Sequence, residues 1–370
     1  MEQSRINEIG MKTLEILIPT YRRPESAAKA IESCLLNSDP RISVRCNSNG
    51  LEPDLERFRD YDSRLIYTCF DSNKGPHANF LYLLQNANAR FCMLLSDEDR
   101  IDSGAAKEIL DYLDNCSDSA HVVSCSVYNL QENRFSYIQD SRLAQVNHDL
   151  NSFLALGLIP TYMSGLIFSV NGLSSIDLVS LVNSSMGNAY GHLDIAKHLL
   201  AHGYLRLYSS KFVLKGIDVY EGGDGYSHRE STLSKQDGNA DLNPFVYGPK
   251  ARARQFYYCD KMLCSLRPRM NLISYYMAKM KNFSFFYYMT VMSDVITIID
   301  SKTTIEKEVI LALNEAKNLN EYVSFSWFAY LFCPLMQMPK PFKTLPLKIL
   351  EKINGLFRRI RMLSIARNNL

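Results

Sequence analysis

The sequence lacks the paired cysteines of a disulfide framework or a zinc site. Its 370 residues include nine cysteines, which is an odd number, and no two of them have CxxC spacing. Several lie within apolar, strand-like runs. This usage predicts reduced thiols in a cytoplasmic protein.

A long apolar run is also missing. The first residues, MEQSRINEIGMKT, are polar, so the sequence predicts no signal peptide. Of the two most apolar late segments, one is interrupted by Ser293 and Asp294 and the other is too short. Neither reaches the roughly 18 apolar residues that a membrane-spanning helix requires. We therefore expect a cytoplasmic protein that crosses no membrane.

The chain has little net charge, but its charges are unevenly distributed. The formal charge is +2, with 46% hydrophobic and 22% charged residues, which is ordinary for a globular protein and gives no global signature of nucleic-acid binding. Residues 339–370 nevertheless carry eight Lys/Arg and one acid. The same segment shows one apolar stripe of helical spacing, made of Leu350, Ile353, Phe357 and Ile360.

This basic amphipathic helix suits the anionic inner face of a membrane, where the protein would associate peripherally. The alternative is a helix that packs on the aromatic-rich C-terminal region or on another protomer. Nucleic acid is not an expected partner, because the basic residues form one helix without a recognised binding module.

Short apolar runs alternate with segments of helical periodicity between residues 14 and 130. The predicted strands are 14–21, 41–50, 64–70, 90–99 and 120–130, and the main predicted helices are 24–36, 77–89 and 103–115. This order predicts an α/β fold, a mostly parallel sheet flanked by helices. After about residue 250 the strand signals fade. We expect two domains, 1–250 and an α-helical 251–370, with the boundary near Gly248–Lys250.

Four loops follow predicted strands and therefore should meet at one edge of the sheet. They are Thr20–Arg23, Asn47–Gly50, Asp71–Gly75 and Ser96–Asp99. In open α/β sheets, ligands bind beyond the carboxyl ends of the strands.

The last of these loops holds three adjacent carboxylates, Asp97, Glu98 and Asp99, directly after the apolar run FCMLL. Hard oxygen ligands of this kind bind divalent cations. The alternative is a solvated acidic loop that starts a helix, with Asp102 or Ser103 as its N-cap.

Four pieces of the chain occur in the order typical of one enzyme family. They are ILIPTYRRPESAAKAIESCL, NSNG, NKGPHANFLYLLQNANARFCMLLSDED and GHLDIAKHLLAHG. With these motifs the chain resembles the family 2 glycosyltransferases of the GT-A fold over roughly residues 13–235. The variant is most similar to bacterial O-antigen and capsule sugar transferases, including the abequosyltransferase-like group.

The resemblance implies an inverting, metal-dependent transfer. A sugar would move from a nucleotide diphosphate donor to a hydroxyl of a bacterial surface glycan, with a saccharide or lipid-linked saccharide as acceptor. The cofactor would be Mn²⁺ or Mg²⁺, which neutralises the departing diphosphate. Asp97 and Asp99 would share the metal and ribose contacts, with Asp99 as the better metal ligand and Glu98 facing elsewhere.

Further site residues are implied by the same resemblance. His228, in a Gly-rich loop, matches a third metal ligand or phosphate contact, although an ordinary surface histidine explains it equally well. The loop PTYRRP would bind the donor through Pro19, Thr20 and Tyr21, with Arg22 or Arg23 at phosphate. The third loop would line the donor pocket with Asn73, Lys74 and Asn79, where a structural turn explains Asn73 as well.

The chain departs from the family pattern at two positions. Ser48, flanked by Asn47 and Asn49, stands where an Asp that contacts the base is expected. His192 stands where a catalytic carboxylate is expected, so an imidazole would deprotonate the acceptor hydroxyl, with Asp194 as the competing candidate. Alternatively, this segment is simply a helix start with Asp194 in its first turn.

These departures leave two rival functions open. A nucleotidyltransferase shares a nucleotide-binding sheet edge and a metal carboxylate, but PTYRRPES lacks the glycines of its phosphate loop. A catalytically inactive scaffold in a membrane glycan-assembly complex would tolerate the altered Ser48 and His192 positions.

Overall fold

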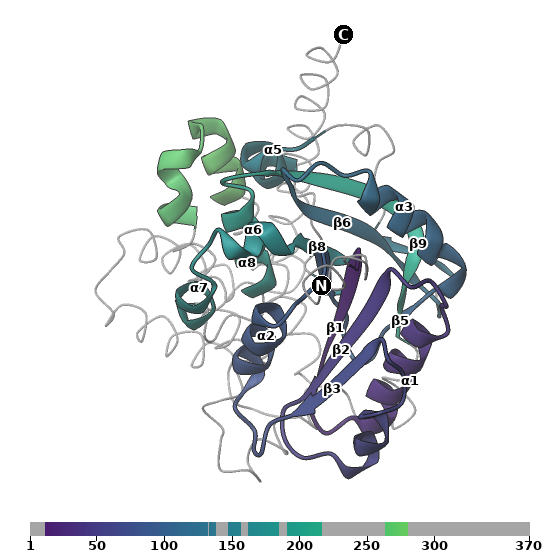
Figure 1. Cartoon of the computed structure of the whole chain (residues 1–370). Coiled ribbons are helices and arrows are strands. Elements are labelled where there is room, and N and C mark those ends of the chain that lie inside the picture. The colour runs from purple at the N-terminus through teal and green to yellow at the C-terminus, as the bar shows by residue number, and fades with distance from the viewer. Residues whose placement is uncertain are drawn as a thin grey trace, which may run out of the picture. The chain divides into compact units, whose positions relative to one another are not determined.

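The computed structural model describes residues 12–131, 133–137, 147–156, 162–184, 191–216 and 263–279 (Figure 1). They belong to two compact units, of which the first holds the described residues up to Gly216 except 151–156. The predicted boundary at Gly248–Lys250, His228 and the basic C-terminal helix lie outside the described residues.

The N-terminal half of the first unit alternates strands and helices, as its periodicity predicts. Its elements are β1 (Leu14–Thr20), α1 (Pro24–Leu35), β2 (Ile42–Ser48), the 3₁₀ helix η1 (Pro53–Phe58), β3 (Leu65–Cys69), α2 (Pro76–Gln85) and β4 (Phe91–Leu94). Proline at the first position of α1 and of α2 fixes φ where no N–H bond is needed.

Shorter elements follow. They are β5 (Arg100–Ile101), η2 (Ser103–Ala105), α3 (Ala106–Asp114), β6 (Ala120–Asn129), β7 (Arg134–Tyr137), β8 (Leu166–Ser169), α6 (Val170–Ser174), α7 (Leu178–Ser184), α8 (Gly191–Leu199) and β9 (Tyr204–Lys215). The described elements also include the helix α5 (Leu150–Leu156), nearly all of it in the second unit, and the 3₁₀ helix η5 (Arg267–Arg269).

One mixed sheet organises the first unit, in the order β3-β2-β1-β4-β8-β6-β9-β5, with β7 paired to β6. The predicted parallel sheet is confirmed for β3, β2, β1 and β4. The second half is mixed, because β8 lies between β4 and β6 and pairs with both in the antiparallel sense. The predicted strand 120–130 forms β6, which is antiparallel to β8 and parallel to β9.

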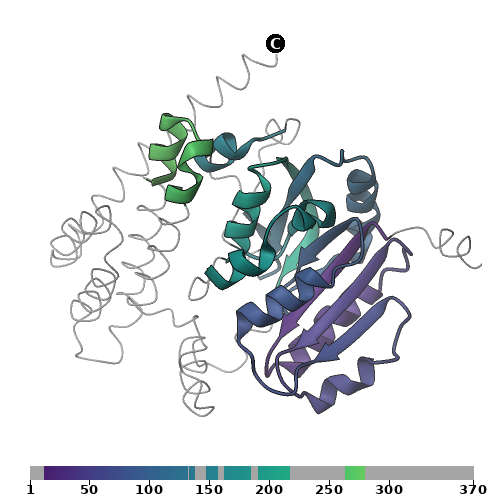
Figure 2. The same ribbon diagram turned by 60° about the vertical axis from the view of Figure 1, so that its left-hand side comes forward.

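Side-chain alternation along β1 explains the two covering layers. Ile16 and Ile18 point into the core cluster that α1 and α3 cover, whereas Leu17 is buried outside that cluster. Helices α2 and α8 cover the opposite face, and α7 packs against both of them (Figures 1 and 2). With helices on both faces, the strand ends remain the accessible place for polar chemistry.

The predicted strand 90–99 ends at Leu94, earlier than expected. The chain turns there, and the Asp99 amide donates to the Ser96 carbonyl at 2.9 Å. It then resumes as β5, which pairs with β9. The acidic triplet therefore lies in a tight connection between two strands rather than at the end of one.

No helix within the described ranges is long and apolar enough to cross a membrane. The cysteines in these ranges are free thiols, most of them buried.

Replacing Ile16 by Ala should lower the free energy of unfolding by about 2–5 kcal/mol, because it leaves a cavity in a fully buried part of β1. The matched control is Ile66→Ala on β3, whose side chain is 45% exposed. It should cost less than about 1 kcal/mol. Urea denaturation followed by circular dichroism measures both, and equal losses would contradict this account of the core.

Candidate functional site

Strand register brings the first and fourth loops together. Leu17 of β1 lies opposite Leu94 of β4 in a parallel pair, so the residues three positions further along, Thr20 and Asp97, also meet. The Thr20 hydroxyl donates to Asp97 Oδ2 at 2.8 Å. The register of β1 with β2 places Thr20 opposite Ser48 as well. Three of the four predicted loops thus share one edge of the sheet.

Asp97 is buried, with 3% of the residue exposed, and has a charged partner. Its Oδ1 lies 3.3 Å from Nη1 of Arg23, the residue that precedes α1. The same Nη1 contacts Oε1 of Glu98. Two carboxylate oxygens therefore converge on one guanidinium nitrogen.

This convergence corrects the expectation that Glu98 faces elsewhere. The turn that begins at Ser96 brings the middle residue of the triplet to the side of Asp97, where both face Arg23. It is Asp99 that faces a different set of partners.

Asp99 is fully buried, and its carboxylate accepts hydrogen bonds from three groups of the chain. The Tyr162 hydroxyl donates to Oδ1 at 2.7 Å, and the Gly216 amide donates to the same oxygen at 2.8 Å. The Ser164 hydroxyl donates to Oδ2. Both carboxylate oxygens thus accept hydrogen bonds from the protein, and these bonds link Asp99 to the segment before β8 and to the end of β9.

Gly216 is required where β9 ends. A Cβ atom at this position would lie 1.9 Å from the carbonyl oxygen of Glu98, closer than any side chain permits. The backbone of Gly216 thus packs directly on the acidic loop while its amide binds Asp99. Any larger residue would displace one of the two segments.

Burial dominates the electrostatics of the three carboxylates. It raises the pKa of Asp97, and the Arg23 charge opposes that rise. Burial also raises the pKa of Glu98 to about 6, against the same Arg23 charge. The pKa of Asp99 is raised by burial too, although the bonds from Ser164 and Tyr162 favour its ionised form. The loop therefore stabilises added positive charge.

The donor set fits a hard divalent cation on the side where Asp97 and Glu98 converge. Two carboxylate oxygens already face one positively charged nitrogen there, and oxygen is the ligand atom that Mg²⁺ and Mn²⁺ prefer. Among the described residues no three His, Cys, Asp or Glu side chains form a ready-made metal site. A cation at this place would complete its coordination with substrate phosphate and water.

A network of side-chain hydrogen bonds holds the loops after β1, β2 and β3 together. The side-chain amide of Asn79, on α2, donates to the backbone carbonyl of Asn47 at 3.0 Å and to that of Thr20 at 3.4 Å. Asn47 donates in turn to Asn79 Oδ1 at 3.0 Å and accepts from Thr68. Asn79 and Asn47 are buried. These side chains tie the loops after β1, β2 and β3 together.

A second pair of bonds fixes the third loop to the second. The Asn49 side chain donates to Asn73 Oδ1 at 2.8 Å and accepts from the Lys74 amide at 2.9 Å. The Ser48 hydroxyl donates to the Gly50 carbonyl at 2.7 Å. Ser48, the residue in place of the expected Asp, is therefore buried and engaged in its own turn.

The two arginines of the first loop point to different places. Arg22 has φ of 55°, in the left-handed region, and its guanidinium lies 5.3 Å from the centre of the Tyr21 ring. Arg23, after this reversal, reaches the acidic triplet. The sequence did not distinguish Arg22 from Arg23 as the phosphate contact. In the structure it is Arg23 that contacts the carboxylates of Asp97 and Glu98.

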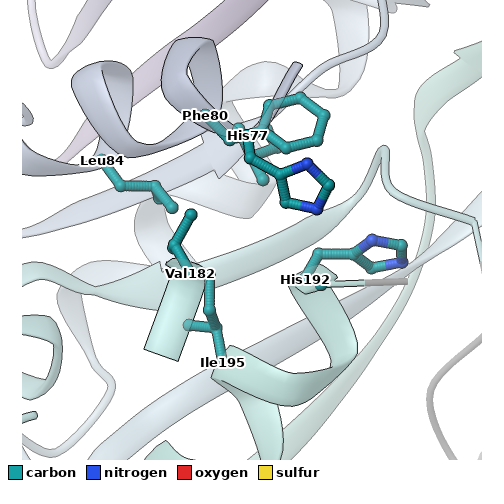
Figure 3. A pocket seen from close by; sticks show the side chains of 8 residues that line it. His77, Phe80, Leu84, Val182, His192 and Ile195 are labelled. Carbon is teal, nitrogen blue, oxygen red and sulfur yellow. The ribbon is translucent and has the colours of Figure 1, made fainter. Parts of the chain in front are cut away.

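A small hollow lies beside the end of β4, between α2, α7 and α8 (Figure 3). Its lining is largely apolar and includes two imidazoles, those of His77 and His192. In Figure 3 the two rings lie at one end of the hollow, away from Leu84, Val182 and Ile195. His77, two residues after Gly75, is a lining residue that the sequence did not single out.

Asp194, the rival of His192, is differently placed. It is buried on α8 and forms an ion pair with Lys197 one turn later, at 3.3 Å. Lys197 is itself buried. Asp194 thus has a fixed charged partner, whereas the His192 ring borders the hollow.

Tyr162 and Ser164, which bind Asp99, were not identified as site residues from the sequence. Both belong to the segment TYMSGL, residues 161–166. Their partner is more than 60 residues away along the chain, at separations of 63 and 65. Only the insertion of β8 beside β4 brings them to the acidic loop.

Comparison with known proteins gives one family. Residues 15–171 match the model for glycosyl transferase family 2. Abequosyltransferase RfbV of Salmonella typhimurium is 25% identical over 200 residues, which are 49% of this chain and 59% of the relative. The match thus spans less than two thirds of that relative.

Several solved structures share a distant likeness. Staphylococcus aureus TarS has a TM-score of 0.47 at 12% identity, over 77% of this chain and 53% of TarS. A mannosyltransferase from Pyrobaculum calidifontis, solved with GDP-Man and Mn²⁺, has a TM-score of 0.46 at 10% identity, over 96% and 90% of the two chains.

Replacing Ser164 by Ala should destabilise the protein by about 1–3 kcal/mol, because the hydroxyl serves two buried groups. It donates to Asp99 and accepts from the Ser96 amide at 2.9 Å. The control is Ser174→Ala, an exposed residue that donates only to a carbonyl of its own helix at 3.1 Å. Urea denaturation of both variants is the measurement, and a Ser164 variant as stable as the control would refute this role.

Proposed function

We propose, from the membership of residues 15–171 in glycosyl transferase family 2, that the chain is an inverting, metal-dependent glycosyltransferase. It moves a sugar from a nucleotide diphosphate donor to a hydroxyl of a bacterial surface glycan. The observation that carries the proposal is the junction of Thr20, Arg23, Asp97 and Glu98 at the strand ends, all within the matched segment. The relative at 25% identity, an abequosyltransferase, supports sugar transfer.

The donor would lie along the loops after β1, β2 and β3. In this proposal Pro19, Thr20 and Tyr21 flank the nucleobase of the donor, while the side chains of Arg23 and Lys74 bind its diphosphate. Ser48, Asn49, Asn73 and Asn79 act by shaping the pocket, since their polar atoms bind one another and the backbone. Neutral amides that hold a loop rigid reduce the entropy lost when a ligand binds.

The metal would be held by Asp97 and by Glu98, on the side where they already share a cation. When bound, Mn²⁺ or Mg²⁺ would stabilise the negative charge that develops on the departing diphosphate. Asp99, with Tyr162, Ser164 and Gly216 on its oxygens, keeps the loop in place. His228 stays a candidate for a further contact.

His192 is the proposed base. Its ring borders the hollow at the end of β4, whereas Asp194 is paired with Lys197. A neutral imidazole can accept the proton of the acceptor hydroxyl near pH 7 as that oxygen attacks the sugar. The acceptor itself, and association with a membrane surface, rest on the sequence of residues 339–370.

Incubation with Mn²⁺ or Mg²⁺ and a panel of sugar nucleotides should release nucleoside diphosphate from one donor, slowly, even without acceptor. Ion chromatography of the products measures this. Release of pyrophosphate would support a nucleotidyltransferase instead. Failure to bind any donor would support an inactive scaffold.

Replacing His192 by Ala should lower the transfer rate by roughly 10²–10⁴-fold, the range for loss of a general base, while donor affinity stays unchanged. The matched control is His198→Ala on the same helix, whose Nδ1 lies 2.9 Å from the Asp194 carbonyl. It should keep nearly full activity. Full activity of the His192 variant would overturn the assignment, and loss of donor binding would show a different role.

A further inference from the structure

The position of Arg23 indicates more than a phosphate contact. Its Nη1 lies 3.3 Å from Asp97 Oδ1 and contacts Glu98 Oε1, so one nitrogen bridges two carboxylates. The Asp97 side chain is 5% exposed and that of Glu98 18% exposed. Carboxylates this buried are costly to ionise without a positive partner. Arg23 supplies that partner.

Two other cationic groups of the described residues, Arg100 and Lys215, are placed differently. Arg100 directs Nη1 at two backbone carbonyls, those of Asp97 at 3.3 Å and Asp99 at 2.8 Å. Lys215 lies 5.1 Å from the centre of the Tyr162 ring. Arg23 is therefore the group that stands at the point where the carboxylates of Asp97 and Glu98 converge. A divalent cation bound by these two oxygens would need the same place.

The Arg23 side chain is also placed so that it can move away from the two carboxylates. Its side chain is 35% exposed, and it belongs to the loop between β1 and α1 rather than to a helix. The carboxylates are fixed more firmly, since Asp97 accepts a bond from Thr20 and the loop is held through Asp99. Displacement of the guanidinium thus requires a side-chain rotation and no change of the sheet.

We propose that Arg23 is an internal counter-ion that occupies the cation position of Asp97 and Glu98, and that a divalent cation binds only by displacing it. The inference rests on the proposed function for the identity of the cation. The displaced guanidinium turns to the diphosphate of the donor, its next anionic partner. Metal and donor consequently bind with positive cooperativity, because each makes the other's site available.

Titration of the full-length protein with Mn²⁺ alone, followed by electron paramagnetic resonance, tests this. The variants Arg23→Ala and Arg23→Gln should bind Mn²⁺ roughly three- to tenfold more tightly than the wild type, because no cation has to be displaced. Glutamine keeps most of the side-chain stem and so separates charge from packing.

Arg22→Ala is the matched control, because it removes the neighbouring positive charge, which lies over Tyr21. Its affinity for Mn²⁺ should equal that of the wild type. The proposal is overturned if the Arg23 variants bind Mn²⁺ equally or more weakly, if no form binds it, or if Arg22→Ala gains as much. Urea midpoints confirm that each variant is folded.

The same preparations should be assayed with the sugar nucleotides. If the wild type breaks down a donor while the Arg23 variants bind Mn²⁺ no more tightly, the counter-ion role of Arg23 is refuted and the proposed transferase is not. Tighter Mn²⁺ binding without breakdown of any donor would refute the proposed transferase and leave the counter-ion in place.

Discussion

Three consecutive carboxylates at the edge of a sheet, two of them buried and one half-buried, are the constraint on which this structure depends. Asp97, Glu98 and Asp99 cannot share one environment, because their charges repel in a region of low solvent access. The turn after β4 separates them into two groups. Arg23 forms ion pairs with Asp97 and Glu98, whereas neutral hydroxyl and amide groups donate hydrogen bonds to Asp99. One triplet thus has two physical roles.

This separation explains why the sheet continues beyond its parallel half. The donors to Asp99 come from the segment before β8 and from the end of β9. The antiparallel β8 brings the first beside β4, and the pairing of β5 with β9 brings Gly216 against Glu98. The mixed half of the sheet therefore supports the acidic loop, whereas the parallel half supplies the loops after β1, β2 and β3.

The part of this arrangement that local pattern determines could be predicted from the sequence. Alternating strands and helices locate the ends of β1 to β4, so the meeting of Thr20 with Asp97 follows from a parallel register. The partners of Glu98 and Asp99 could not be predicted. They depend on a turn, on β8 and on Gly216, which lies 117 residues from Asp99, and no short-range periodicity encodes such pairings. The family resemblance likewise pointed to Asp99 without showing that its oxygens are occupied.

The two sides of the loop cluster also differ in how they can respond to a ligand. Asn47, Asn49, Asn73 and Asn79 form neutral bonds that satisfy one another, so movement there would leave buried polar groups unpaired. The charged side contains a partly exposed arginine whose partners can be exchanged for other ions of the right sign. In the proposed function, the rigid neutral half would position the nucleotide, while the charged half would adjust to the diphosphate and its cation. The two halves meet at Thr20, whose carbonyl accepts from the Asn79 side chain and whose hydroxyl donates to Asp97. One residue thus fixes the position of the charged half relative to the neutral half.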